Sequence, residues 1–171
     1  MHNIVYKWII DQRCNYENQS NLASFTVYLL FIGLILENSA LFAFDTTYTA
    51  NRHRIAIKGY DPVGYFIQNT ALKGDKYISV EYDGAKWLFS SEANRQIFLG
   101  NPTKYMPQYG GYCAYALSRN AVSSSKPEYF TILNGKLYLK FGKVAFKRWS
   151  KDPEKYIALA DASWAKRVNT L

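Results

Sequence analysis

The chain has 171 residues, of which 49% are hydrophobic and 17% aromatic, so it is long enough to bury one sizeable core and too short for two large domains. Its formal net charge is +8, but the lysines and arginines are scattered and form no basic run of the kind that binds nucleic acid. This charge pattern disfavours a nucleic-acid-binding protein and leaves peripheral association with an anionic membrane open.

An apolar segment stands near the N-terminus. Residues 22–36 have the sequence LASFTVYLLFIGLIL, without a charge, after Lys7 and Arg13 and before a small-residue segment that ends at Ala43. This order is typical of a secretory signal peptide, and the apolar stretch is shorter than the roughly 20 residues that a spanning helix needs. We therefore predict a leader over residues 1–43 and export to the periplasm or the extracellular space, with an uncleaved membrane anchor as the alternative.

Two hairpin signals follow the leader. The pair Asp83-Gly84 separates two strand-like runs in ISVEYDGAKWLF, and the pair Asn134-Gly135 does the same in YFTILNGKLYL. Both pairs tolerate positive φ at the two central positions of a type I′ turn, which is the strongest short-range hairpin signal. The sequence therefore predicts two β-hairpins.

A helical pattern follows each hairpin. Ser90 or Ser91 can cap the helix after the first hairpin, and Pro102 and Pro153 each follow an Asn or Asp where a further helix would begin. The apolar residues that we expect on the buried helix faces are Ala93, Ile97 and Phe98 after the first hairpin, and Val144, Ala145, Trp149, Tyr156, Leu159, Ala160 and Trp164 after the second.

The two hairpin-and-helix segments form an internal repeat with an offset of 51 residues. The positions that match in register are Gly84 with Gly135, Trp87 with Tyr138, Leu88 with Leu139, Phe98 with Trp149, Pro102 with Pro153, Lys104 with Lys155 and Tyr105 with Tyr156. We predict an α+β fold, a small single domain of two related β-hairpin-plus-helices units packed against each other. The domain is expected over residues 55–168, after a short segment 44–54, with the repeat at about 78–109 and 129–160.

A tyrosine-rich stretch, YMPQYGGYCAYA, lies between the two repeats and contains Cys113. The only other cysteine is Cys14, in the predicted leader, so the exported chain would have no partner for an internal disulfide. The Gly110-Gly111 pair predicts a sharp turn that places Cys113 at the start of a short helix over residues 114–117. The thiol is then either a small buried hydrophobic group or a reactive nucleophile stabilised by the helix N-terminus.

Three runs of the sequence, IAIKGYDPVGYF, YDGAKWLFSSEANRQIFLGNPTKYMPQYGGYCAYA and NGKLYLKF, resemble the exported or membrane-associated branch of the YHS-domain proteins. The resemblance extends from about Ile55 to Trp164. YHS domains elsewhere accompany copper-transporting ATPases and some hydroxylases, and they are suspected of binding metal through cysteines. The resemblance therefore implies an accessory or binding protein linked to copper handling, with copper or another transition-metal ion as its cofactor.

The cysteines of the metal-type YHS pattern are missing from this chain. That pattern is similar to Asp-Pro-Val-Cys-Gly, followed by Phe-Cys-Ser and a further cysteine a few positions on. Here Gly64 stands at the first cysteine position, Ser90 at the second, and Asn94 near the last. A zinc or soft copper site needs several Cys or His ligands held together, and the chain cannot supply the family set.

Other residues provide weaker candidates for a site. Cys113, Met106 and His53 are chemically suitable ligands for Cu(I), although nothing in their spacing requires them to converge. Asp61 is predicted to cap a short helix that begins at Pro62, with a ligand-binding carboxylate as the alternative. The residues that either line a ligand cleft or form a mixed polar and aromatic core include Tyr60, Asp61, Tyr109 and Tyr112.

The sequence contains no phosphate-binding glycine loop, no His-Glu-x-x-His and no Gly-x-Ser-x-Gly motif. We therefore expect an exported accessory or binding protein without catalytic machinery, whose partner is an unknown small ligand or an envelope protein. Two other classes stay open. One is a thiol-dependent redox enzyme that uses Cys113, and the other is a basic envelope-associated structural protein.

Overall fold

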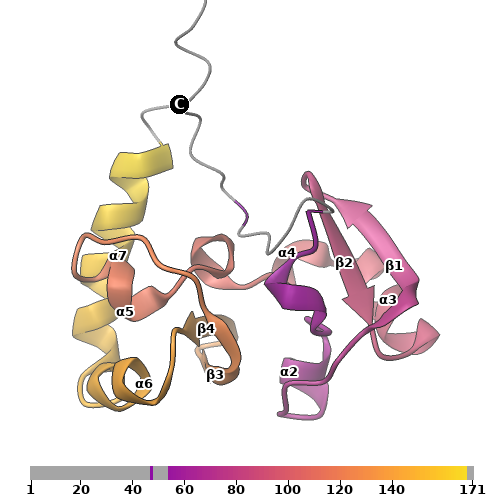
Figure 1. The fold of residues 1–171 in the computed structure, drawn as a ribbon, viewed down its shortest axis with the longest axis horizontal. Helices are drawn as coiled ribbons and strands as arrows, with labels where there is room; N and C mark the ends of the chain where they lie inside the picture. Colours follow the sequence, from indigo (N-terminus) through magenta and orange to yellow (C-terminus); the bar gives the residue numbers. More distant parts are fainter. Residues whose placement is uncertain (1–46, 48–53, 169–171) are drawn as a thin grey trace, which may run out of the picture. The chain divides into compact units, whose positions relative to one another are not determined.

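The structure is a computed structural model that describes residue 47 and residues 54–168 (Figure 1). Its elements, in chain order, are η2 (Ile57–Gly59), α2 (Gly64–Ile67), β1 (Asp75–Tyr82), β2 (Ala85–Phe89), α3 (Glu92–Gly100), α4 (Pro102–Tyr105), η3 (Gln108–Gly111), α5 (Ala114–Leu117), β3 (Lys126–Leu133), β4 (Lys136–Lys140), α6 (Lys143–Trp149) and α7 (Pro153–Val168). The predicted α+β class is confirmed. The predicted leader lies outside the described residues, and no helix within them is long and apolar enough to cross a membrane.

Two antiparallel hairpins form the β structure, β1 with β2 and β3 with β4. Both predicted turns are present. Asp83 and Gly84 have φ of 50° and 67°, and Asn134 and Gly135 have φ of 51° and 69°. Positive φ at both central residues is what a type I′ turn requires, so the hairpin prediction from these two dipeptides is confirmed.

The two hairpins share one pairing register. Val80 pairs with Trp87 in the first hairpin, and Thr131 pairs with Tyr138 in the second, each pair displaced by 51 residues from the other. Each hairpin also has an irregularity at the same place, between residues 75 and 79 and between residues 126 and 130. The chain is therefore built from two related hairpin-plus-helices units, as predicted.

The structural repeat begins earlier in the chain than the sequence repeat indicated. A 3₁₀ turn with left-handed residues precedes each hairpin: Lys58 and Gly59 have φ of 57° and 77° in η2, and Gly110 and Gly111 have φ of 58° and 87° in η3. Each of these turns leads into a four-residue helix, α2 in one case and α5 in the other. The left-handed residues of the two turns are 52 apart and the two helix starts are 50 apart, so a fixed offset of 51 does not align them.

Single β-bridges confirm this longer repeat. Ile55 bridges in parallel to Lys86, and Pro107 bridges in parallel to Leu137. We therefore define the first unit as residues 54–106 and the second unit as residues 107–168. The stretch YMPQYGGYCAYA, which lies between the two sequence repeats, contains the start of the second unit in this definition.

The strand β4 contributes to two hydrophobic clusters. Leu137 and Leu139 point into the cluster of the first unit, whereas Tyr138 points into the cluster of the second. Successive side chains of a strand alternate between its faces, so one strand can serve both cores. The first-unit residues around Leu137 and Leu139 are Ala56, Ile57, Val63, Tyr65, Ala85, Trp87, Phe89, Phe98 and Tyr105. The residues around Tyr138 are Tyr109, Ala114, Leu117, Trp149 and Ala160.

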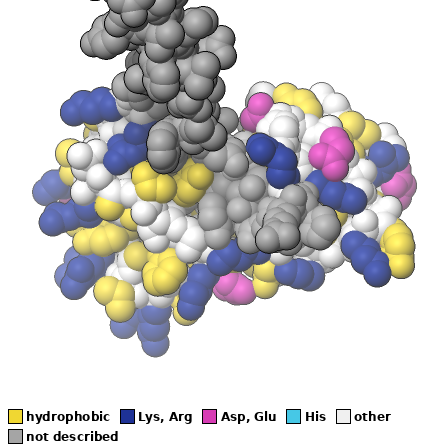
Figure 2. Space-filling view, turned by 45° about the horizontal axis from the view of Figure 1, so that its top comes forward, with side chains coloured by type: hydrophobic (Ala, Val, Ile, Leu, Met, Phe, Trp, Pro, Cys, Tyr) yellow, Lys and Arg dark blue, Asp and Glu magenta, His cyan; other side chains and the backbone are white. Residues whose placement is uncertain are grey.

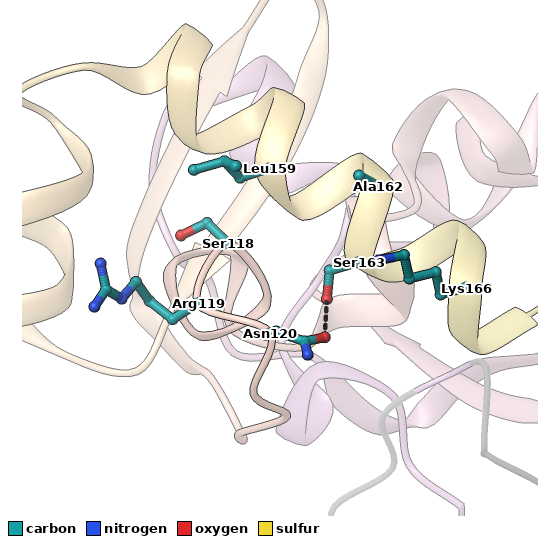
Figure 3. Close-up of a pocket in the computed structure, with 7 residues that line it drawn as sticks. All are labelled: Ser118, Arg119, Asn120, Leu159, Ala162, Ser163 and Lys166. Atoms are coloured by element: carbon teal, nitrogen blue, oxygen red, sulfur yellow. Dashed lines mark hydrogen bonds between the residues drawn. The ribbon is translucent and has the colours of Figure 1, made fainter.

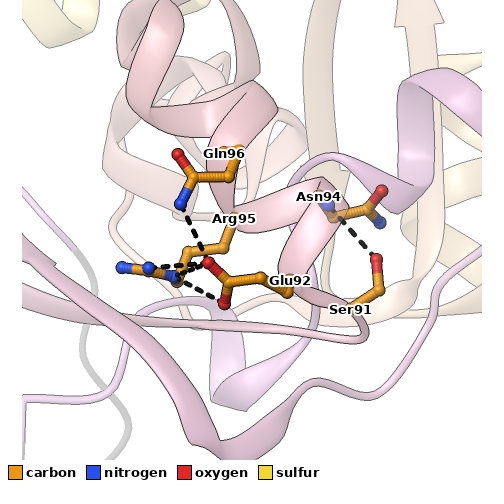
Figure 4. Close-up of polar contacts among 5 residues, drawn as sticks. All are labelled: Ser91, Glu92, Asn94, Arg95 and Gln96. Atoms are coloured by element: carbon orange, nitrogen blue, oxygen red, sulfur yellow. Dashed lines mark hydrogen bonds and ion pairs between the residues drawn. The ribbon is translucent and has the colours of Figure 1, made fainter.

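The helix starts follow the predicted caps. Ser91, and not Ser90, caps α3, with its Oγ accepting the N–H of Asn94 at 3.1 Å (Figure 4). Pro102 begins α4 after Asn101, whose side chain accepts the N–H of Lys104. Asp152 Oδ1 likewise accepts the N–H of Lys155 where α7 begins. These side chains satisfy amide groups that the first turn of a helix leaves without a partner.

The buried helix faces are only partly as predicted. Phe98 and Trp149 are buried, but Val144 is 63% exposed, Leu159 is 46% exposed and Ile97 is 36% exposed. Helix periodicity alone places these residues on an inner face. The helices α3 and α6 are only nine and seven residues long, and each buries a single apolar side chain, Phe98 in α3 and Trp149 in α6.

Candidate functional site

Asp61 lies between η2 and α2 and is completely buried. Its Oδ1 atom accepts hydrogen bonds from the backbone N–H groups of Val63, at 2.9 Å, and Gly64, at 3.3 Å. The carboxylate thus caps the turn that leads into α2, which is the structural role predicted for it. The helix itself begins at Gly64, two residues later than the predicted start at Pro62.

The other oxygen of Asp61 joins two further segments. Oδ2 accepts hydrogen bonds from Ser90 N at 2.8 Å, Ser90 Oγ at 2.6 Å and Asn94 Nδ2 at 2.7 Å. Ser90 follows β2 directly, and Asn94 lies in α3. We call Asp61, Gly64, Ser90 and Asn94 the Asp61 cluster. It connects the α2 turn, the end of the first hairpin and α3 through one carboxylate.

The five hydrogen bonds explain how a carboxylate is accommodated here. Removing a carboxylate from water is unfavourable unless hydrogen bonds or a countercharge replace its hydration. Each hydrogen bond to a charged group contributes about 1.5–3 kcal/mol, so five donors can offset a large desolvation penalty. The donors to Asp61 are all neutral amide or hydroxyl groups.

The Asp61 cluster brings together Gly64 and Ser90, which stand at cysteine positions of the metal-type pattern that the sequence resembles, and Asn94, which lies near the last cysteine position. Gly64, Ser90 and Asn94 each donate to Asp61. The sequence pattern identifies Gly64, Ser90 and Asn94 separately, and the structure shows that they surround Asp61. In this chain, a buried carboxylate and its neutral donors connect these three positions.

The donor set does not fit copper or zinc. Zinc and Cu(I) sites in proteins use several thiolate or imidazole ligands, and the Asp61 cluster offers one carboxylate, one hydroxyl and one amide. Both oxygens of Asp61 are already engaged by N–H and O–H donors. Among the residues that the structure describes, no three His, Cys, Asp or Glu side chains come together as a metal site.

The cluster lies just below the protein surface. Asp61 and Asn94 are buried, with Asn94 only 4% exposed, whereas Ser90 is exposed to solvent. Next to the cap at Ser91, the exposed carboxylate of Glu92 accepts hydrogen bonds from Arg95 and Gln96 (Figure 4). The hydrogen bond from Arg95 is the main reason why the pKa of Glu92 is lowered to about 2. The first turn of α3 therefore presents a polar, ordered surface beside Ser90.

Cys113 occupies the N-cap position of α5, over the predicted residues 114–117. The thiol is buried, with 1% exposure, and its Sγ accepts the N–H of Ala116 at 3.4 Å and that of Phe141 at 3.3 Å. Of the two interpretations of Cys113, the structure favours the packed and capping thiol, because a nucleophile must be reached by its substrate.

Lys140, which the sequence analysis did not single out, is buried next to this thiol. Its Nζ donates to Thr131 Oγ1 at 2.6 Å and to Tyr138 O at 3.2 Å, and it lies 4.2 Å from the ring centre of Trp149. Burial lowers the pKa of Lys140 to about 7, and the nearby Cys113 acts in the opposite direction. The alternation of side chains along a strand could have indicated this burial, because residues 138 and 140 lie on the same face of β4 and Tyr138 points into the core.

The tyrosines predicted to line a cleft with Asp61 do not come together. Tyr60 donates its hydroxyl to Glu128 at 2.7 Å, and Tyr109 donates to Asp161 at 2.8 Å. The ring of Tyr112 lies 6.2 Å from that of Trp164. Tyr109 and Tyr112 thus belong to the aromatic core of the second unit, as the alternative interpretation expected, whereas Tyr60 connects the two units. Burial is the main cause that raises the pKa of Tyr109.

Of the three predicted Cu(I) ligands, the structure describes Met106 and Cys113, and His53 lies outside the described residues. Met106 is half-buried and packs against the core of the first unit. The thiol of Cys113 accepts two backbone N–H groups in the second unit. The Cu(I) hypothesis stays a prediction.

A cavity of about 420 Å³ lies between α7 and the turn after α5 (Figure 3). Ser163 Oγ donates to Asn120 Oδ1 at 3.3 Å, and Arg167 also donates to that oxygen at 3.1 Å. The residues that line the cavity are Ser118, Arg119, Asn120, Leu159, Ala162, Ser163 and Lys166. Asn120 thus accepts hydrogen bonds from both Ser163 and Arg167, so the cavity lies at a contact between α7 and the turn after α5. No predicted site residue lines this cavity.

A family model of the YHS domain matches residues 63–109. The matched segment contains Gly64, Ser90 and Asn94 and ends before Cys113 and Lys140. The YHS domain is associated with metal handling, and with copper in particular. Neither the search of curated proteins nor that of solved structures finds a match to the chain.

Proposed function

Since this chain is a YHS domain-containing protein, we propose that it is an exported accessory protein that binds another molecule through this domain, without catalysis and without a metal ion at the Asp61 cluster. The observation that carries the proposal is the saturation of Asp61 by five hydrogen bonds. These bonds keep the YHS frame ordered at the place where the metal-type pattern has its cysteines. A domain held in this way can present a surface to a partner, but the Asp61 cluster has no soft ligands to offer a metal.

The ordered surface around Ser90 is the part of the domain best suited to recognition. Ser90 is exposed while its hydroxyl is fixed by Asp61, and the neighbouring Glu92 is fixed by Arg95 and Gln96. Groups that are already positioned lose little conformational entropy when they bind. This property supports recognition of a polar small ligand or of an envelope protein.

Export is the part of the proposal that rests on sequence. Residues 22–36 are apolar and uncharged between a basic segment and a small-residue segment that ends at Ala43. The experiment is to express the full chain in a bacterial host and to determine the mass and the N-terminal sequence of the product in the envelope fraction. We expect a chain that begins at Phe44. An intact chain in the cytoplasm would contradict export.

The metal part of the proposal is tested by the metal content of the native protein. Mass spectrometry of metals on the purified full chain should find no stoichiometric copper or zinc, both for the unmodified protein and for Cys113→Ser. The finding of one copper or zinc ion per chain in the unmodified protein, absent from Asp61→Asn, would overturn it. A metal ion absent only from Cys113→Ser would instead place the metal at the thiol, outside the Asp61 cluster.

A thiol-dependent redox enzyme that uses Cys113 is the second candidate function. It is favoured by one observation, the buried Lys140, whose pKa responds to the charge of Cys113. A cation beside a cysteine stabilises the reactive thiolate. The 1% exposure of Cys113 opposes this function, because a substrate would have to reach the sulfur. The rate at which Cys113 is labelled in the folded protein distinguishes the two functions.

A further inference from the structure

The exposed side of α6 combines apolar and basic side chains. Phe141 is 50% exposed and Val144 is 63% exposed, and they lie three residues apart at the start of the helix. The basic residues on the same segment are also exposed. We call this surface the α6 face; it consists of Phe141, Lys143, Val144, Lys147, Arg148 and Lys151.

The α6 face has no acidic residue within its own segment. Residues 141–151 contain four basic residues and no Asp or Glu. The second unit as a whole has eleven Lys and Arg against four Asp and Glu, a net charge of +7, whereas the first unit has seven against five, a net charge of +2. On the face shown in Figure 2, basic and hydrophobic side chains are interspersed over the second unit at the left.

A cavity of about 570 Å³ lies next to the α6 face, between β3 and α6. The residues that line it are Glu128, Tyr129, Phe130, Lys143, Phe146 and Lys147. Glu128 is its one acidic residue and accepts the hydroxyl of Tyr60 at 2.7 Å. Lys126 extends the basic surface from β3, with its Nζ 5.6 Å from the ring centre of Phe141. The α6 side of the cavity therefore carries two lysines, Lys143 and Lys147.

An exposed Phe and Val surrounded by lysines match the chemistry of a membrane surface. Apolar side chains can enter the boundary between headgroups and acyl chains, while lysine and arginine remain among the phosphates. Each Lys or Arg near an anionic bilayer contributes about 1 kcal/mol to binding. We propose that the α6 face docks peripherally on a bilayer that contains anionic phospholipids. This proposal is independent of the partner recognised around Ser90, which lies in the first unit.

The experiment measures sedimentation of the full chain with vesicles of phosphatidylcholine alone and with vesicles that also contain phosphatidylglycerol, at low and high ionic strength. We expect binding to the anionic vesicles that weakens as salt rises. The double variant Lys143→Glu/Lys147→Glu should bind these vesicles about tenfold or more weakly, and Val144→Ser should bind a few-fold more weakly.

The matched control is Lys76→Glu/Tyr77→Ser in the first unit. Tyr77 is 82% exposed and Lys76 lies over its ring at 4.7 Å, so this pair also combines an exposed aromatic residue with a lysine. The control should bind like the unmodified chain. All the substituted side chains are exposed, so each variant should keep the circular dichroism spectrum and the unfolding midpoint of the unmodified chain.

Two results would overturn the proposal. If the α6 variants bind anionic vesicles as tightly as the unmodified chain, another segment, such as the apolar residues 22–36, holds the membrane. The second result combines three observations. Poly-glutamate would bind the unmodified chain as tightly as the vesicles do, Val144→Ser would bind vesicles normally, and Lys143→Glu/Lys147→Glu would not. The α6 face would then be a general polyanion site and not a lipid-docking surface.

Discussion

The carboxylate of Asp61 and the thiol of Cys113 occupy equivalent places in the two units. Each side chain accepts the backbone N–H of the residue that follows the second strand of its hairpin, Ser90 at 2.8 Å for Asp61 and Phe141 at 3.3 Å for Cys113. Asp61 also caps the turn that leads into α2, and Cys113 caps α5 directly. The same connection is therefore made by a carboxylate with five donors in the first unit and by a thiol with two in the second.

Replacement of Asp61 by Asn should destabilise the fold. The amide keeps the shape of the side chain, but its NH₂ group would face N–H or O–H donors that now point at a carboxylate oxygen. A lost partner in a buried, charged network costs about 2–4 kcal/mol, so the free energy of unfolding in urea should fall by that amount.

The matched control for Asp61→Asn is Glu81→Gln, an exposed carboxylate on β1. Its effect should stay within about 0.5 kcal/mol, as for most surface substitutions. Equal unfolding midpoints for Asp61→Asn and Glu81→Gln would show that the Asp61 cluster does not hold the YHS frame together.

The thiol of Cys113 should react slowly in the folded protein. A sulfur that is 1% exposed and engaged by two N–H groups can be reached only when the second unit opens. In a Cys14→Ser background, a thiol-specific disulfide reagent should label Cys113 slowly at pH 7 and rapidly in denaturant. Rapid labelling without denaturant would instead favour the thiol-dependent enzyme.

The substitution Lys140→Met should stabilise the protein near neutral pH. It removes a buried ammonium group whose described hydrogen bonds go to a neutral hydroxyl and a neutral carbonyl, and it keeps an unbranched side chain against Trp149. Exchange of a buried charge for a well-packed apolar group can raise the free energy of unfolding by about 1–4 kcal/mol. A lower free energy of unfolding would mean that the ammonium group stabilises the second core.

The pH dependence of stability should reveal the same lysine. Because the pKa of Lys140 is lowered to about 7 in the folded state, the unfolded chain binds a proton that the folded chain has lost at higher pH. Well below pH 7 the charged lysine should lower the free energy of unfolding by an amount that does not change with pH. The free energy of unfolding should rise as pH increases from about 7 towards 9. Each pKa unit corresponds to about 1.4 kcal/mol, so the rise should reach a few kcal/mol.

The control for this pH dependence is the Lys140→Met variant, in which the rise between pH 7 and 9 should be absent. The pKa of Tyr109 is raised, so that hydroxyl does not titrate in this range. The pKa values of Glu92 and Glu128 are lowered, so they titrate at more acidic pH. An unchanged slope in the variant would assign the pH dependence to another group.

Local signals in the sequence predicted the parts of the fold that local chemistry determines. Asp83-Gly84 and Asn134-Gly135 fixed both hairpins because few dipeptides tolerate two positive φ values in succession. Asn101 before Pro102 marked a helix start, because a cap and a proline each satisfy the requirements of a first turn. The α+β class and the two related units followed from these turns and from the repeat.

The parts that were missed depend on contacts between distant segments. Asp61 meets Ser90 and Asn94 across about thirty residues of chain, and no spacing rule links these three positions. The burial of Lys140 contradicts its usual preference for solvent, and only its place on β4 explains it. The exposure of Val144 also depends on tertiary packing, since α6 covers its core mainly with Trp149.

We infer that the Asp61 cluster holds the YHS frame together without a metal, at Gly64, Ser90 and Asn94, which stand at or near the cysteine positions of the metal-type pattern. A copper and zinc titration of the unmodified chain beside the variant Gly64→Cys/Ser90→Cys/Asn94→Cys tests this inference. We expect the triple variant to gain stoichiometric metal and the unmodified chain to bind none. Stoichiometric binding by the unmodified chain, abolished by Asp61→Asn, would contradict it.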